Sequence, residues 1–257
     1  MLRQTPHDNI QMKTFIVAGR VLSQLRGDKR FLVLSIIAPL IIIYFLKLLF
    51  DTFPPNPVFS YTHYTIPISA FIVHFLSFIL CAILLVQERT RGTLERMMIG
   101  GFSKTSIIGG YTLGYFGLAT LQAIAVLVES IWLFELDYGT KTIVVLFIVI
   151  WLLAIVSVML GIFISTFAKH EGHVFPFIPL IILPSVFLTG LIVEPSGLPR
   201  WAEIVGDCLP LHYAVNIIHE IIKPDYDLAN TFTDFGILAG YIIGLLVLAS
   251  LTLKETE

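Results

Sequence analysis

Six long runs of hydrophobic residues, separated by short polar segments, dominate the chain. An α-helix needs about 20 apolar residues to cross the hydrocarbon core of a bilayer, and each run has roughly that length. The runs cover residues 31–50, 65–86, 105–131, 142–167, 174–193 and 235–253. The pattern therefore predicts an all-α membrane protein with six transmembrane helices, in which residues 1–257 form a single membrane domain.

A different periodicity precedes the first run. Across residues 10–26, apolar side chains recur at helical spacing, and basic side chains accompany them at Lys13, Arg20 and Arg26. A basic amphipathic helix tends to lie in the membrane interface. We therefore expect an interfacial helix here, with an ordinary cytoplasmic segment as the alternative. Its broad apolar face would consist of Ile10, Phe15, Val17, Val21, Leu22 and Leu25.

The fifth run is interrupted by proline at positions 176, 179 and 184. Proline removes a backbone donor and kinks or breaks a helix. A broken helix persists at membrane depth only where protein or a cavity covers the freed carbonyl groups. We therefore expect the fifth span to face the protein interior.

The longest polar segment, residues 194–234, follows the fifth run and is rich in acidic residues. Within it, residues 211–223 read as a short amphipathic helix with Leu211, Val215 and Ile218 on the apolar face. The sequence thus predicts a re-entrant or amphipathic outer region between spans five and six.

The basic residues fall unevenly on the two sides of the predicted membrane. Three lie on one side: Lys141, Arg200 and Lys223. Twelve lie on the other: Arg3, Lys13, Arg20, Arg26, Lys29, Arg30, Arg89, Arg91, Arg96, Lys104, Lys169 and Lys254. Because basic segments stay cytoplasmic, both termini of this multi-pass protein are expected on the cytoplasmic side of the cell (plasma) membrane.

The composition agrees with this picture. Hydrophobic residues make up 56% of the chain and charged residues only 13%, about half the share in a soluble domain, which is roughly 25%. The net charge of −2 gives no indication of nucleic-acid binding. Cys81 lies inside an apolar run, so a disulfide with Cys208 is not expected.

The segment between the second and third runs is the most informative polar stretch. It interleaves Glu88 and Glu95 with arginine and then groups Leu94, Met97 and Met98. Adaptable apolar anchors ringed by charges are typical of a docking surface. A solvated charged loop fits the residue types equally well.

Four short motifs resemble those of the ATP-binding-cassette exporter permeases of the second type (the ABC-2 membrane domain). The first is Glu88-Arg89 followed by Gly92-Thr93-Leu94-Glu95. The others are Phe187-Leu188-Thr189-Gly190, Leu198-Pro199-Arg200-Trp201 and Leu209-Pro210-Leu211-His212-Tyr213. They occur in the family's order, and they extend the resemblance over nearly the whole chain. Threonine at position 189 stands where the family often has serine.

The resemblance implies roles for particular residues. Residues 10–26 would be the interfacial connecting helix. Residues 88–98 would be the coupling segment seated on an ATPase subunit, through Glu88, Arg89, Arg91, Gly92, Thr93, Leu94, Glu95, Met97 and Met98. An outer gate or re-entrant region would include Thr189, Gly190, Pro199, Trp201, Pro210 and Tyr213. The implied assembly contains a second permease, as a homodimer or heterodimer, and two ATPase subunits, surrounded by membrane lipid.

The chain shows no ATPase motif of its own. A phosphate-binding loop requires glycine before its Lys-Ser/Thr pair. The Lys-Thr pairs begin at Lys13, Lys104 and Lys141, and none follows glycine. We therefore expect a transporter subunit that is not an enzyme and binds no cofactor, with ATP and Mg²⁺ on the partner.

Three polar residues inside the runs are candidates for lining a pathway: His74, Gln122 and Glu129. A charge at the centre of a span costs about 2.5–3.5 kcal/mol on insertion scales, so such groups usually face protein or water. Packing between helices is the favoured alternative for His74 and Gln122. For Glu129, near the outer end of its span, a role at the outer interface or in helix packing is favoured.

No metal site is expected. His219 and Glu220 resemble the start of a zinc-protease motif, but Lys223 stands where the second histidine is needed. His212 and His219 would lie about 10.5 Å apart along a helix, too far for one metal ion.

Two other function classes remain open at this stage. One is a secondary transporter or channel outside the ABC class, which would have no use for the mixed-charge segment. The other is a membrane-embedded lipid-modifying enzyme, which would need a polar constellation at one membrane depth.

Overall fold

The structure, a computed structural model, describes residues 6–52, 61–192 and 197–252. Regular structure in these ranges is helical. The long helices are α1 (Pro6–Gly27), α2 (Lys29–Thr52), α3 (Tyr61–Thr90), α5 (Lys104–Leu133), α6 (Thr140–Ser165) and α10 (Phe232–Thr252). The shorter ones are α4 (Thr93–Ile99), α7 (Phe177–Leu188), α8 (Arg200–Asp207) and α9 (Pro210–Ile221), with 3₁₀ turns at Glu171–His173 and Leu228–Thr231.

Six helical segments of the described chain are long and apolar enough to cross a membrane, which confirms the expected fold class. They are α2, α3, α5, α6, α7 with the 3₁₀ turn before it, and α10 with the turn before it. α3 runs from Tyr61 to Thr90, beyond the predicted limits of 65 and 86 at both ends. Its last turn therefore carries the polar residues Glu88 and Arg89.

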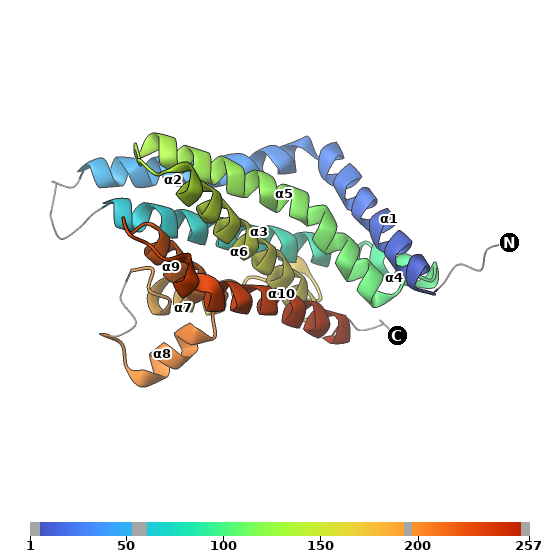
Figure 1. The fold of residues 1–257 in the computed structure, drawn as a ribbon. Helices are drawn as coiled ribbons and strands as arrows, with labels where there is room; N and C mark the ends of the chain where they lie inside the picture. Colours follow the sequence, from blue (N-terminus) through green and yellow to red (C-terminus); the bar gives the residue numbers. More distant parts are fainter. Residues whose placement is uncertain (1–5, 53–60, 193–196, 253–257) are drawn as a thin grey trace.

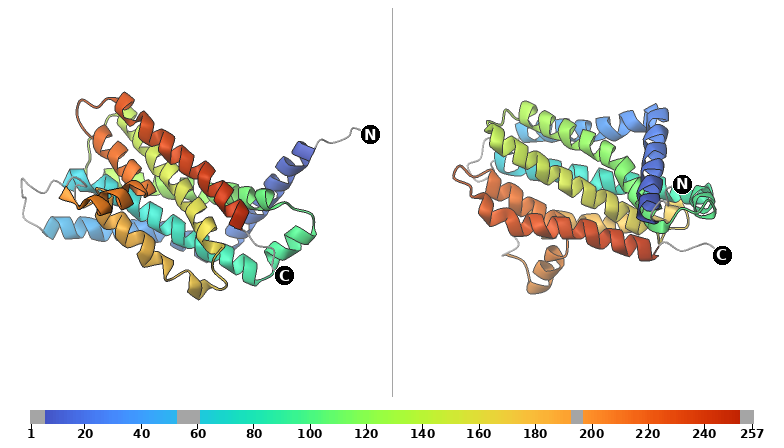
Figure 2. Two further views of the ribbon diagram at one scale, coloured as in Figure 1. Left: turned by 90° about the horizontal axis from the view of Figure 1, so that it is seen from below. Right: turned by 45° about the vertical axis from the view of Figure 1, so that its right-hand side comes forward.

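The bundle is built around α3 and α6, which pack side by side, with α5 and α10 against them (Figure 1). Gly161 of α6 permits this approach. A Cβ atom at position 161 would lie 2.6 Å from the carbonyl oxygen of Phe78 and 3.0 Å from the nitrogen of Ala82. The start of α1, α4 and the end of α10 share one end of the bundle, and α9 lies at the other (Figures 1 and 2).

α1 packs along the first half of α5 through glycine. Val17 and Val21 of α1 are buried, and they lie directly over Gly110 and Gly114 of α5. A Cβ atom at position 114 would lie 2.5 Å from Cβ of Val21, and one at position 110 would also overlap Val17. Small residues four apart let two helices approach closely in a membrane. This helix pair therefore depends on those two glycines.

The broad apolar face expected on residues 10–26 is divided in two. Val17, Val21 and Leu25 are buried against the bundle, whereas Phe15 and Leu22 are exposed. Met12 and Ile16 join the exposed side. α1 therefore has one face for protein and another that suits lipid, which a single hydrophobic stripe did not indicate.

The fifth span, which was expected to face the protein interior, is not enclosed by this chain. α7 lies at the edge of the bundle (Figure 1), with Leu180, Leu183 and Phe187 exposed. Pro176 caps the helix and Pro179 falls in its first turn, where a missing donor costs nothing. Only Pro184 is interior to the described helix. α7 thus remains helical without a cover of its own chain.

We predict that Gly114→Ala weakens the attachment of α1. The new methyl group would overlap Val21, and overpacking typically costs about 1–3 kcal/mol. The matched control is Gly117→Ala, where a Cβ atom would lie 3.4 Å from the flexible end of Leu22. Thermal unfolding in detergent should show a lower midpoint for Gly114→Ala alone. Equal midpoints for the two variants would contradict the close packing.

Candidate functional site

Glu88, in the last turn of α3, is the centre of a hydrogen-bonded cluster at the end of the bundle that carries α4. Its residue exposure is only 3%. Its Oε2 accepts from Arg20 at 2.8 Å and from the Tyr111 hydroxyl at 3.0 Å, and its Oε1 accepts from Gln24 at 2.7 Å. We call Arg20, Gln24, Glu88 and Tyr111 the Glu88 clasp. It joins α1, α3 and α5 through one carboxylate.

Pairing with Glu88 stabilises the charged form of Arg20. Partial burial alone would lower the pKa of Arg20, but the hydrogen bond and negative charge of Glu88 outweigh it. The pKa therefore lies above the usual arginine value. A buried carboxylate is tolerated only when it is paired and hydrogen-bonded, and the clasp meets both conditions.

Arg89 points away from α4, toward the end of α6. Its Nη1 donates to the carbonyl oxygens of Ser165 at 2.9 Å, Thr166 at 3.3 Å and Ala168 at 3.0 Å. The last carbonyls of a helix lack helical partners and attract basic side chains. Arg89 thus fastens the end of α6 to the end of α3.

The short helix α4 follows at once. Gly92 turns the chain with φ = 68°, in the left-handed region that favours glycine. Leu94 is buried beneath the helix, and Met97 and Met98 are half-buried. Ile99 is 87% exposed. Arg91, Glu95 and Arg96 are exposed around it, while Gly92 and Thr93 are half-buried at the start of the helix.

α1 also contacts α4 and the turn that follows it. Lys13 donates to the carbonyl of Gly101 at 2.6 Å and lies 5.6 Å from the centre of the Phe102 ring. Arg20 reaches the Met97 sulfur at 3.6 Å. Arg26, further along α1, is exposed and has no partner of this kind among the described residues. Lys13 and Arg20 therefore act within the protein, and Arg26 faces outward.

The expected outer region is built from α8 and α9. The amphipathic helix predicted at 211–223 corresponds to α9, with Leu211, Val215 and Ile218 buried. α8 was not anticipated. It packs its Gly206 against the carbonyl of Leu188 at the end of α7, where a side chain would clash.

The motif residues of this region have distinct surroundings. Thr189 is fully buried and donates to the Ser185 carbonyl at 2.6 Å, and Gly190 turns the chain with φ = 87°. Pro199 and Pro210 begin α8 and α9. Tyr213 donates to the Asp207 carbonyl at 2.6 Å. Partial burial raises the pKa of the Tyr213 hydroxyl, and the negative charge of Asp207 adds to this.

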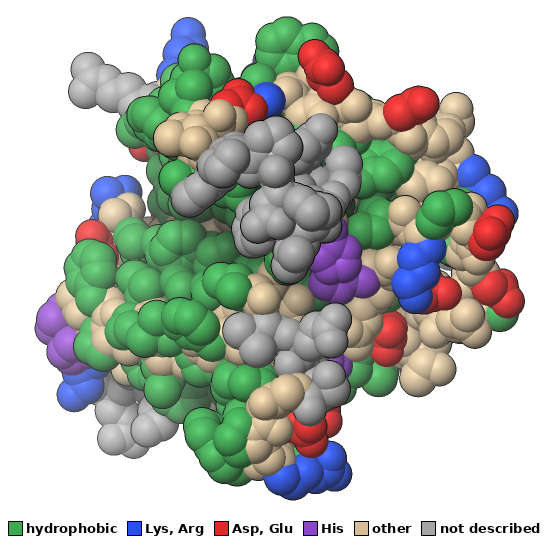
Figure 3. Space-filling view, turned by 90° about the vertical axis from the view of Figure 1, so that its left-hand side faces the viewer, with side chains coloured by type: hydrophobic (Ala, Val, Ile, Leu, Met, Phe, Trp, Pro, Cys, Tyr) green, Lys and Arg blue, Asp and Glu red, His purple; other side chains and the backbone are tan. Residues whose placement is uncertain are grey.

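Trp201 is exposed. The end face of the molecule in Figure 3 carries charged and histidine side chains beside broad hydrophobic areas. At this end His63, at the start of α3, stacks on His219 of α9 with ring centres 4.2 Å apart. Burial, together with His63 and Lys223, lowers the pKa of His219 to about 4. His219 is therefore neutral at pH 7.

Comparison with known proteins decides the family. Residues 12–222 match the family model described as ABC-2 type transporter, and this range includes α4, the Glu88 clasp, α8 and α9. The chain belongs to the ABC-2 type transporter family.

Individual relatives of this ABC-2 chain are distant. It is 25% identical over 174 residues to ABC transporter G family member 20 of Dictyostelium discoideum, which covers 67% of this chain and 24% of that protein. It is 23% identical over 175 residues to the probable multidrug ABC transporter permease YbhR of Escherichia coli K12, covering 67% and 47%. The linearmycin resistance permease protein LnrN of Bacillus subtilis is 22% identical over 157 residues, covering 61% and 40%. The chain thus spans between about a quarter and about half of the length of these relatives.

Two of the three candidate pathway residues of this ABC-2 chain serve packing between helices. His74 is buried, and its Nδ1 shares a 2.7 Å hydrogen bond with the Ser157 hydroxyl of α6. Gln122 accepts from Ser77 at 2.9 Å and donates to the Ser35 carbonyl of α2 at 2.7 Å. Pro39 lies four residues after Ser35 and cannot donate to that carbonyl. Gln122 therefore satisfies the group that the proline leaves free.

Glu129, the third candidate, differs from both. It is half-buried near the C-terminal end of α5, and its Oε2 is buried. No described residue gives that oxygen a hydrogen bond. Of the three residues, only Glu129 has a fully buried side-chain oxygen or nitrogen with no hydrogen-bond partner among the described residues.

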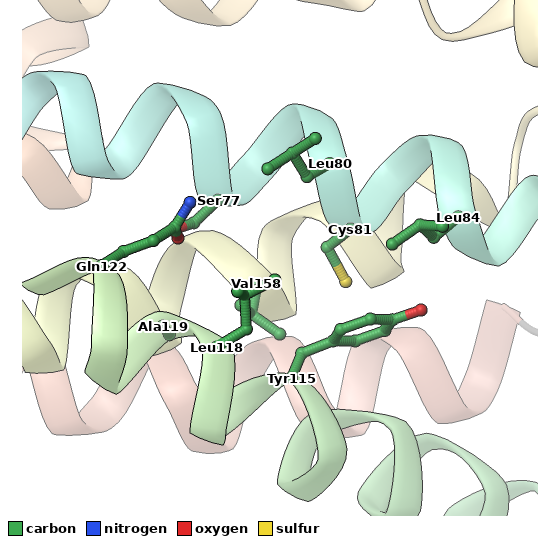
Figure 4. Close-up of a pocket in the computed structure, with 9 residues that line it drawn as sticks. All are labelled: Ser77, Leu80, Cys81, Leu84, Tyr115, Leu118, Ala119, Gln122 and Val158. Atoms are coloured by element: carbon green, nitrogen blue, oxygen red, sulfur yellow. The ribbon is translucent and has the colours of Figure 1, made fainter. Parts of the chain in front are cut away.

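A small hollow lies between α3 and α5 on the α4 side of Gln122 (Figure 4). Ser77 and Gln122 form one end, and the Cys81 sulfur points toward the Tyr115 ring. Its lining is otherwise apolar: Leu80, Leu84, Leu118, Ala119 and Val158. The hollow has a volume of only about 10 Å³, which is room for about one water molecule, and its lining offers no reactive constellation.

The sequence alone did not identify Gln24, Tyr111 or Ile99 as functional. Tyr111 lies inside an apolar run, where a tyrosine is counted among the hydrophobic residues and its hydroxyl group is overlooked. Ile99 is one residue beyond the segment that was singled out. Ile99 lies four residues after Glu95, so both share one face of a short helix. This spacing could have extended the predicted docking surface to Ile99.

We predict that Glu88→Gln loosens the Glu88 clasp. Removing the charge weakens hydrogen bonds to a charged group, each worth roughly 1.5–3 kcal/mol. Thermal unfolding in detergent should show the loss, and Glu171→Gln, at an exposed carboxylate, is the control. In the double variant with Arg20→Gln, the two losses should be less than additive. Strict additivity would mean that the ion pair contributes nothing.

Proposed function

We propose that this chain is the membrane-spanning permease subunit of an ATP-driven ABC exporter. Two copies of a separate ATPase subunit bind ATP and Mg²⁺, and a second permease completes the translocation pathway. The observation that carries the proposal is α4, a short helix whose apolar tip is exposed while its base is fixed to three long helices. The names of the relatives YbhR and LnrN, a multidrug permease and a resistance permease, support export.

The contact with the ATPase is formed by the solvent-exposed surface of α4. Ile99 supplies an apolar anchor, and Arg91, Glu95 and Arg96 fix its orientation by charge. Met97 and Met98 add adaptable apolar surface beside it. Glu88 and Arg89 lie behind this surface and keep it in place, since their hydrogen bonds are within the chain.

A displacement of α4 passes to the membrane helices through rigid contacts. Lys13 and Arg20 connect α4 to α1, and the Glu88 clasp connects α1 to α3 and α5. The close packing of Val21 on Gly114 leaves no space for α1 to move without α5. Closure of the two ATPases on ATP would thus change how α3 and α5 sit in the permease dimer.

We predict that Ile99→Glu abolishes association with the ATPase. Burying an unpaired carboxylate in the contact costs several kcal/mol, and each 1.4 kcal/mol is a factor of ten in affinity. The tagged chain purified from native membranes should carry ATP hydrolysis activity, and the Ile99→Glu chain should not. Ile99→Leu is the matched control and should retain it. Equal hydrolysis in all three preparations would contradict the assignment.

The native cysteines allow a test of orientation, with α4 and both termini in the cytoplasm. Cys208 is exposed beside α8, and Cys81 is buried. We predict that a membrane-impermeant maleimide labels intact cells through Cys208, and that Cys208→Ser removes the label. In that background, Arg91→Cys should react only after permeabilisation. Labelling of Arg91→Cys from outside would refute the orientation and the coupling with it.

A further inference from the structure

We propose that α1 carries a binding surface for anionic phospholipid, in the bilayer leaflet at the end of the bundle that holds α4. The surface combines exposed apolar residues on one side of α1 with two cations where α1 meets α2. We call it the α1 lipid surface, and its members are Met12, Phe15, Ile16, Leu22, Arg26 and Lys29. The inference goes beyond the proposed export function, because it concerns the lipid headgroup that the permease selects.

The apolar part of the α1 lipid surface is a stripe on the side of α1 that faces away from the bundle. Its members, Met12, Phe15, Ile16 and Leu22, recur at helical spacing and are all exposed, Phe15 to 68%. Gly19 lies in the middle of the stripe, and a Cβ atom at that position would have no neighbour within 4 Å. The opposite side of α1 packs on α5. The described part of the chain therefore leaves this stripe uncovered.

The bilayer is the occupant that fits this position. α1 ends at Gly27 and α2 begins at Lys29, so one residue separates the stripe-bearing helix from a helix long enough to span the membrane. The first turns of α2 expose Val33, Leu34 and Ile37. The stripe on α1 thus continues an apolar surface that starts on a membrane span, while α1 itself turns across the end of the bundle (Figure 2). A helix placed in this way lies in the interface with its apolar side against the acyl chains.

Two cations close the stripe at the end next to α2. Arg26 follows Leu22 by four residues and so lies on the same side of α1. Arg26 and Lys29 are both exposed, and neither forms an ion pair with another described residue. Asp28, which lies between them, accepts a hydrogen bond from the Phe31 nitrogen at 3.0 Å and so caps the start of α2.

The class of lipid follows from the division of charges along α1. Lys13 and Arg20 donate to groups of the protein, whereas Arg26 and Lys29 face the headgroup region. A zwitterionic phospholipid would cover the apolar stripe, but its own ammonium group would oppose the two cations. An anionic phospholipid suits both parts of the surface, since each basic residue beside an anionic leaflet adds to the attraction.

The test uses the full chain in vesicles of equal parts phosphatidylglycerol and phosphatidylcholine, with Leu22→Trp as a reporter one turn from Arg26. Brominated acyl chains quench tryptophan fluorescence on contact, and one lipid at a time carries the bromine. The signal of the reporter is the difference from the chain without it. We expect quenching to be about threefold stronger, or more, when phosphatidylglycerol carries the bromine.

Charge variants separate the two parts of the surface. Arg26→Gln combined with Lys29→Gln should bring the ratio of the two quenching signals close to one, and both lipids should still quench because the apolar stripe is intact. Arg26→Gln alone should lower the ratio, and Lys169→Gln, at an exposed cation between α6 and α7, is its matched control and should not. High salt screens exposed charges, so it should lower the ratio in the reporter chain without any charge variant.

Equal quenching by the two lipids in the reporter chain would overturn the headgroup assignment, as would a ratio that survives the double variant. Absence of quenching by either lipid would overturn the whole inference. A reporter signal that then depends on the number of chains per vesicle would assign the stripe to a second copy. These outcomes leave the exporter assignment intact, because that assignment is tested by association of the ATPase with α4.

Discussion

The arrangement at the end of the bundle that carries α4 depends on one buried carboxylate. A charge removed from water is tolerated only with a full set of partners, and Glu88 obtains its partners from α1 and α5. Because the donors come from two other helices, the three cannot separate without exposing an unpaired charge. The amphipathic helix α1 is thereby part of the folded bundle as well as a surface element.

Elsewhere the helices associate through close packing at small residues and through hydrogen bonds between helices, because burying apolar surface gives little driving force for association in lipid. Gly110, Gly114 and Gly161 allow close backbone approach. Hydrogen-bonded polar pairs cross between helices at intervals along α3, where Ser69 meets Ser130, His74 meets Ser157, and Ser77 meets Gln122. The polar residues within the spans are therefore mostly structural, and Glu129 stands out because it is not paired in this way.

The sequence was sufficient for the number of spans and the fold class, since run length and hydropathy depend only on local composition. It was also sufficient for α9, where apolar spacing was clear. It could not separate the two sides of α1, because a residue facing lipid and one facing protein are equally apolar. Nor could it show that the Glu88 and Arg89 side chains bond to other helices of the chain, since both belong to a mixed-charge segment typical of a docking surface. Partners 23 to 79 residues away decide their direction.

Arg89 has a mechanical consequence. It holds the last carbonyls of α6, and eight residues separate Ala168 from the start of α7 at Phe177. The same turn of α3 that anchors α4 therefore also sets the origin of α7, the helix least covered by its own chain.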